Sequence, residues 1–110
     1  MTTEKLREAL GLTVFVEGEE PDRGVTGCYI GDLLSWVMGR APADCVWLTV
    51  MQNVNVAAVA LLADVSCVVL TENVKPDPGL TERAQQKGVA LYGSDKDAYA
   101  LACRIKDLLG

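Results

Sequence analysis

Hydrophobic residues are grouped along the 110-residue chain in two ways, and each grouping predicts a different element. Two unbroken apolar runs, residues 45–50 and 66–70, have the length of strands that are buried on both faces of a sheet. Apolar residues at helical spacing predict helices over residues 53–63, 77–88 and 94–109. A further strand is expected at residues 89–92, so strands and helices alternate from residue 45 onward.

The first 44 residues predict shorter elements. These are a helix from Thr3 to Leu10 that stops at Gly11, a strand at 12–16, a polar loop at 18–27, an extended piece at 28–30 and a brief helix at 33–38, capped by Asp32 and closed by Gly39. The later helices are expected to begin at Asn53 or Asn55, at Asp77 and at Ser94.

Alternation of strands and helices indicates a mostly parallel sheet with right-handed crossovers. The length fits one domain, so the expected fold is a single three-layer α/β domain over residues 1–110, with helices flanking the sheet.

Charge and hydropathy narrow the class of partner. The net charge is −5 and no run of Lys or Arg is present, so the chain lacks the basic face that phosphate backbones require. The longest apolar stretch, residues 54–63, is too short to span a membrane, and the polar N-terminus does not have the pattern of a signal peptide. We therefore expect a cytoplasmic protein that binds neither nucleic acid nor membrane.

Four cysteines and the absence of histidine limit the chemistry. Cys45 and Cys67 lie inside apolar runs, which predicts buried, reduced thiols. No Cys-x-x-Cys, P-loop or dinucleotide fingerprint is present, so neither a metal nor another cofactor is expected. Ser-His and Cys-His pairs cannot form without histidine. The chain is expected not to be an enzyme; the alternative is a small enzyme that uses Asp22, Asp32 or Cys28.

Polar residues after three expected strands suggest a ligand crevice, because ligands of open parallel sheets sit beyond the carboxyl ends of the strands. Glycines in the first of these segments would let backbone N–H groups approach a ligand closely. The residues expected to line or support the crevice are Asp22, Arg23, Gly24, Thr26, Gly27, Asp32, Asn53, Asn55 and Lys75. The expected ligand is a small anionic or nucleotide-like metabolite. In the alternative interpretation the asparagines are helix caps, and Asp22 or Glu20 holds Arg23.

The brief helix at residues 33–38 is apolar on almost every side, so its outer surface is expected to be buried against something else. A symmetric second copy is the common solution in small domains. We expect a homodimer with Leu34, Trp36 or Met38 near the interface.

Two blocks of this sequence resemble the DRTGG domain family. The first runs from Asp22-Arg23-Gly24-Val25-Thr26-Gly27 to Ile30-Gly31-Asp32-Leu33-Leu34-Ser35 and on to Val37-Met38, and it is similar to the family pattern D-R-x-V-x-G-x-Y-x-G-D-L-L-S-x-V-M. The second runs from Trp47-Leu48-Thr49-Val50 through Asn53 and Asn55 to Ala60, with Asn53 where the family pattern has a histidine. The resemblance extends over nearly the whole chain.

The resemblance implies an α/β domain similar in fold to the N-terminal domain of HPr kinase/phosphorylase. Such domains occur in certain phosphotransacetylases and CBS-domain pyrophosphatases, where they look regulatory or oligomerising. The leading hypothesis is therefore a non-catalytic regulatory, ligand-sensing domain, possessing a small-molecule or protein partner. The alternative is an assembly module without a small-molecule ligand.

Overall fold

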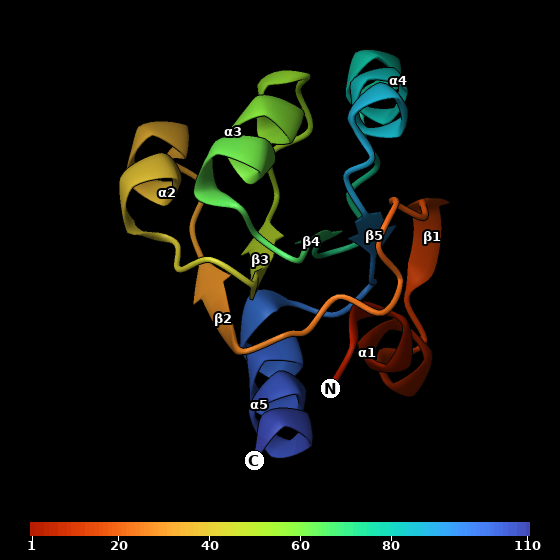
Figure 1. The fold of residues 1–110 in the computed structure, drawn as a ribbon, viewed down its shortest axis with the longest axis vertical. Coiled ribbons are helices and arrows are strands. Elements are labelled where there is room, and N and C mark those ends of the chain that lie inside the picture. Colours follow the sequence, from red (N-terminus) through yellow and green to blue (C-terminus); the bar gives the residue numbers. More distant parts are fainter.

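The computed structural model describes residues 1–110 and contains one five-stranded sheet in the order β1-β5-β4-β3-β2 (Figure 1). The strands are β1 (Thr13–Val16), β2 (Gly27–Ile30), β3 (Cys45–Thr49), β4 (Cys67–Leu70) and β5 (Leu91–Gly93). Strands β2 to β5 pair in parallel, whereas β1 pairs antiparallel with β5. The prediction of a mostly parallel sheet is confirmed.

Helices cover both faces of the sheet and complete the three expected layers. The helices are α1 (Thr3–Leu10), α2 (Leu34–Arg40), α3 (Asn55–Ala63), α4 (Pro78–Lys87) and α5 (Ala98–Leu109). Figure 1 shows α2, α3 and α4 on one face, with α1 and α5 on the other. None of the five helices is long and apolar enough to cross a membrane.

Each face of the sheet has its own hydrophobic core, because successive side chains of a strand point to opposite faces. Trp47 and Val68 pack towards α3 and α4, whereas Val46 and Cys67 pack towards α1 and α5. All five residues of β3 and all four of β4 are buried, as the unbroken apolar runs predict. Val50, expected to be buried in the same strand, lies just beyond it and is half-buried.

The direction of β1 determines where the connecting loops lie. The loop from residue 17 to residue 26 starts at the end of the sheet where β2 to β5 begin, because β1 runs against them. It then crosses from one side of the sheet to the other to reach β2 (Figure 1). We refer to this end of the sheet as the amino edge and to the opposite end as the carboxyl edge.

Several helix ends differ from their predicted positions. Thr2, not Thr3, caps α1, because its hydroxyl accepts a hydrogen bond from the Lys5 N–H. Asp97, not Ser94, caps α5 by accepting from the Ala100 N–H at 2.8 Å. Helix α2 continues through Gly39 to Arg40. The stops at Gly11 and Gly88 are confirmed, and both glycines adopt the left-handed conformation.

The two ends of the chain lie on the same side of the molecule, in the layer of α1 and α5 (Figure 1). Leu6 of α1 and Leu101 and Ile105 of α5 share one core. The guanidinium of Arg104 also donates to the carbonyl of Ala9 at 2.9 Å. The first and last helices are therefore joined directly to each other.

Candidate functional site

The predicted ligand residues do not meet in one crevice, so that prediction is wrong. Asp22, Arg23, Gly24, Thr26 and Gly27 lie at the amino edge, whereas Asp32, Asn53, Asn55 and Lys75 lie at the carboxyl edge. The first reason is the antiparallel direction of β1, which places the loop after it at the amino edge. The second is that α2, α3 and α4 share one face of the sheet, so the crossovers from β2 to β5 form no switch-point crevice.

Arg23 is held by two aspartates that are far from it in sequence. Its Nη2 donates to Oδ1 of Asp44 and to Oδ1 of Asp64, both at 2.8 Å, and to the backbone carbonyl of Asp64 at 2.7 Å. Its Nε also donates to Asp44 Oδ1 at 3.1 Å. We call Arg23, Asp44 and Asp64 the Arg23 cluster. It joins the long loop to the residue before β3 and to the residue after α3.

The Arg23 cluster stabilises two unusual backbone positions. Asp44 and Asp64 both have positive φ, at 65° and 59°, a conformation that is costly for residues other than glycine. Burial alone would lower the pKa of Arg23, but its hydrogen bonds to both aspartates raise the pKa above its ordinary value. The side chains of the expected partners Asp22 and Glu20 make no hydrogen bond or ion pair with Arg23, so the alternative based on them is also wrong.

The remaining residues of the loop are used for backbone pairing or exposed to solvent. Gly24 forms an isolated antiparallel bridge with Thr2, and the Thr26 N–H donates to the Asp44 carbonyl. Asp22 is exposed. A Cβ on Gly24 or on Gly27 would meet nothing within 4 Å, and neither glycine has a positive φ. These two glycines are therefore not required by close approach or by backbone conformation.

At the carboxyl edge, Asp32 fastens the end of β3 instead of capping α2. Its Oδ1 accepts from the buried hydroxyl of Thr49 at 2.8 Å and from the Val50 N–H at 3.0 Å. The residue before Asp32 has a similar role, because the Gly31 carbonyl accepts from the indole N–H of Trp47 at 2.8 Å. The N-cap position of α2 belongs to Leu33, which has no side-chain cap.

The other polar groups of the carboxyl edge bind to one another. Asn53 Oδ1 accepts from the Asn55 N–H at 2.9 Å, in the turn that leads into α3. Lys75 donates to Asn73 Oδ1 at 3.1 Å and lies 5.8 Å from the centre of the Phe15 ring. Gln52 donates to the Lys75 carbonyl at 2.6 Å. Gln52, Asn53 and Lys75 thus each make a side-chain hydrogen bond within the chain, whereas Asn55 contributes only its backbone N–H.

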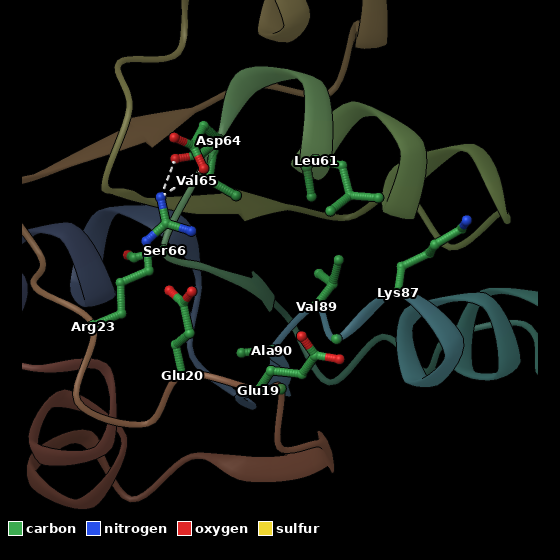
Figure 2. Close-up of a pocket in the computed structure, with 13 residues that line it drawn as sticks. Glu19, Glu20, Arg23, Leu61, Asp64, Val65, Ser66, Lys87, Val89 and Ala90 are labelled. Carbon is green, nitrogen blue, oxygen red and sulfur yellow. Dashed lines mark hydrogen bonds and ion pairs between the residues drawn. The ribbon is translucent and has the colours of Figure 1, made fainter.

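A cavity of about 230 Å³ lies at the amino edge, where no site was predicted (Figure 2). Its walls come from the long loop, from the ends of α3 and α4 and from the residues that lead into β4 and β5. We call it the amino-edge pocket. Its charged residues are Glu19, Glu20, Arg23, Asp64 and Lys87, and its apolar wall contains Ala60, Leu61, Val65, Val89 and Ala90.

Burial disfavours the thiolate form of Cys28, Cys45 and Cys67. It raises the pKa of Cys28 and of Cys45 to about 11 and that of Cys67 to about 12. A thiol is a nucleophile only as its thiolate. All four cysteines are free, and Cys45 and Cys67 are buried as predicted. The high pKa of Cys28 argues against its use as a nucleophile.

The residues expected at a dimer interface divide between the inside and the outside of the molecule. Leu34 packs against the core beneath α2. Trp36 and Met38 are 55% and 45% exposed, and Arg40 lies 4.1 Å from the centre of the Trp36 ring. Ile30 and Leu33, just before the helix, are 52% and 61% exposed. The four exposed residues, Ile30, Leu33, Trp36 and Met38, belong to one continuous segment at the β2 side of the sheet.

Sequence reasoning missed both partners of Arg23. Asp44 lies between the expected helix at residues 33–38 and the expected strand at residues 45–50, and Asp64 follows a helix without a glycine to mark its end. Each aspartate sits in the left-handed conformation that aspartate tolerates better than most residues. An aspartate at a predicted helix end was the available signal, but its pairing with Arg23 depends on the three-dimensional course of the loop.

The fold and this network define a small three-layer α/β domain whose motif residues join distant segments of one chain. The model of the DRTGG domain matches residues 5–108. The chain belongs to the DRTGG domain family, as its two sequence blocks indicated.

A solved structure has the same fold. It is the crystal structure of the CBS and DRTGG domains of the regulatory region of a Clostridium perfringens pyrophosphatase, complexed with the activator diadenosine tetraphosphate. The TM-score is 0.72 at 11% sequence identity, and the match covers 93% of this chain. This chain spans only 44% of the length of that one. No curated protein matches the sequence.

Proposed function

We propose that this chain is a non-catalytic regulatory domain that senses a small polar metabolite in the amino-edge pocket and works as a homodimer in the cytoplasm. The observation that carries the proposal is the pocket itself, which has a volume of about 230 Å³ and is lined by charged side chains. The regulatory region of the pyrophosphatase with the same fold supports the regulatory part by analogy.

The hydrogen bonds, pKa and exposure of the three candidate catalytic residues support a binding role over a catalytic one. Catalysis by Asp32 is disfavoured because its carboxylate oxygen holds Thr49 and Val50. Catalysis by Cys28 is disfavoured because its pKa is raised to about 11. Asp22 is exposed and makes no side-chain hydrogen bond or ion pair that would orient it.

The exposed apolar segment supports the homodimer. Ile30, Leu33, Trp36 and Met38 cluster at the β2 side of the sheet, and β2 is an edge strand. A second copy would cover this segment with the same segment of its own, as in a two-fold symmetric interface. The partner is therefore a copy of this chain, and Trp36 is its expected anchor residue.

Light scattering tests the homodimer. The unmodified chain is expected to run as a dimer at micromolar concentration, and Trp36→Asp is expected to give a monomer. Tyr99→Asp is the matched control, because Tyr99 is 78% exposed on α5 and is not part of the segment. A monomeric unmodified chain would refute the dimer.

A thermal-shift screen tests the sensing function. The screen uses nucleotides, diadenosine tetraphosphate, inorganic phosphate, amines and free amino acids, each at millimolar concentration. Binding raises the melting temperature, because a ligand that binds only the folded state stabilises it. If no compound of any class has an effect while the chain is dimeric, the domain is an assembly module instead of a sensor.

A further inference from the structure

The amino-edge pocket holds charges of both signs that do not pair across it. Glu19, Glu20 and Lys87 make no side-chain hydrogen bond or ion pair, although all three line the same cavity. In Arg23, Nε and Nη2 are used by Asp44 and Asp64, whereas Nη1 has no partner. Two carboxylates and two cationic donors are thus free to bind a ligand.

These groups are spread along the pocket rather than gathered at one point (Figure 2). Arg23 lies at one end with Asp64, Lys87 lies towards the other end, and Glu19 and Glu20 lie between them on the loop. Opposite the loop, Leu61 near the end of α3, Val65 in the connection to β4 and Val89 provide an apolar wall. A ligand that matches all of these groups carries both charges and an apolar part.

Two helix C-termini add partial negative charge to the amino-edge pocket. Helices α3 and α4 both finish at the pocket, where their cap residues Asp64 and Gly88 line the wall. The C-terminus of a helix carries a partial negative charge, which favours a cation and disfavours an anion. Together with Glu19 and Glu20, the two helix ends disfavour a ligand with only negative charge, such as inorganic phosphate.

We propose that the amino-edge pocket binds a small zwitterion of the amino-acid class, so that this site senses an amino acid or a close relative. The carboxylate of the ligand binds the free Nη1 of Arg23, and its ammonium group binds Glu19 or Glu20 near the end of α4. An apolar side chain contacts Leu61, Val65 and Val89. The inference rests on the proposed sensing function and names the class of its ligand.

The first experiment compares ligands that differ by one group. Standard free amino acids are screened by thermal shift, and L-leucine is then compared with isoamylamine, which lacks the carboxylate, and 4-methylpentanoate, which lacks the ammonium group. At least one amino acid is expected to raise the melting temperature, while removal of either charged group abolishes the effect. If inorganic phosphate, nucleotides or simple amines stabilise the domain and amino acids do not, the sensing function stands and the zwitterion is refuted.

The second experiment locates the site by titration calorimetry with the amino acid found. Glu19→Gln and Glu20→Gln remove charges without removing any side-chain hydrogen bond of the folded chain. The variant that removes the partner of the ammonium group is expected to weaken binding roughly tenfold, as for loss of one charge-assisted hydrogen bond, with an unchanged melting temperature of the free protein.

An exposed residue on another part of the chain provides the matched control. Glu8→Gln changes the net charge in the same way outside the pocket and is expected to leave the affinity unchanged. An affinity that falls equally in Glu19→Gln and Glu8→Gln would refute the amino-edge pocket as the site. The same conclusion would follow if neither pocket variant changed the affinity.

Discussion

The two edges of the sheet use polar residues in different ways. At the carboxyl edge, Asp32, Asn53 and Lys75 each have at least one side-chain hydrogen bond to a neighbour in the same chain. At the amino edge, Arg23 is shared between two aspartates and still retains a free donor beside unpaired Glu19 and Glu20. The amino edge thus has a cavity with glutamates that make no side-chain hydrogen bond or ion pair, whereas these three residues of the carboxyl edge each have a partner.

This difference shows that a rule about α/β sheets depends on the path of the chain. Ligands gather at the carboxyl edge when neighbouring crossovers leave the sheet on opposite faces. Here α2, α3 and α4 lie on one face, and the long loop crosses the amino edge instead (Figure 1). The cavity follows the loop, because loops rather than strand ends form the walls of the open space.

The largest expected difference between the edges is in alkaline stability. Cys28, Cys45 and Cys67 lie in the first residues of β2, β3 and β4, and burial raises their pKa to about 11, 11 and 12. The unfolded chain ionises its thiols above about pH 9, before the folded chain does. The contribution of these thiols to the free energy of unfolding is therefore at its maximum below pH 9 and falls as the pH rises towards 12.

Urea unfolding at several pH values measures this loss. Cys67 alone is expected to contribute roughly 3 kcal/mol of destabilisation near pH 11. Cys67→Ala lowers stability at neutral pH but is expected to make the alkaline decline less steep. Cys103→Ser, at an exposed position, should leave the decline as it is. An equal slope in Cys67→Ala and the unmodified chain would contradict the assigned cause.

Loss of the Arg23 cluster should have the next largest effect. Arg23→Ala is expected to lower the free energy of unfolding by about 2 kcal/mol, because Asp44 and Asp64 lose their shared donor. Arg23→Lys keeps the charge but not the several N–H donors of the guanidinium group. Its free energy of unfolding should therefore lie between those of the unmodified chain and Arg23→Ala. Denaturant unfolding gives both values. A loss below about 0.5 kcal/mol in Arg23→Ala would mean that the cluster does not support the edge.

The corresponding change at the carboxyl edge should be smaller. Asp32→Ala removes two hydrogen bonds, to Thr49 and to the Val50 N–H, at an exposed position, and is expected to cost about 1 kcal/mol. Asp32→Asn retains an oxygen acceptor and should cost less. If Asp32→Ala lowered the melting temperature more than Arg23→Ala did, the hydrogen bonds at the carboxyl edge would contribute more to stability than the Arg23 cluster.

The smallest effects should distinguish two glycines near the amino terminus. Gly24→Ala is expected to change stability by less than about 0.5 kcal/mol, since its Cβ meets open space and its φ is not positive. Gly11→Ala also meets open space, but φ is 62° there, so it should cost about 1 kcal/mol. Comparable losses in both variants would show that the loop needs glycine for a reason other than conformation.

The sequence allowed the buried parts of this fold to be predicted better than its edges. Strands β3 and β4 could be predicted from their runs of apolar residues, because burial on both faces favours apolar residues at nearly every position. The direction of β1 had no such signal, since four residues with one alternating pattern fit either direction equally well. That single ambiguity moved half of the predicted site to the wrong edge.

Site residues were harder to predict, because their partners are distant in sequence. Asp32 stands directly before a helical segment, where a capping role and a cross-strand role look the same in sequence. Arg23 finds its partners 21 and 41 residues away. Neither separation follows from local spacing, and both depend on how the loop crosses the sheet.

The direct contact between the first and last helices has a consequence for joining this domain to other proteins. Both chain ends leave from the α1 and α5 layer, whereas α2, with exposed Trp36, lies on the opposite face (Figure 1). A fluorescent protein or another domain can therefore be attached at either end, or the whole unit inserted into a host loop, without covering that helix. Insertion at two neighbouring points is also the geometry that transmits a small change in shape from a guest domain to its host.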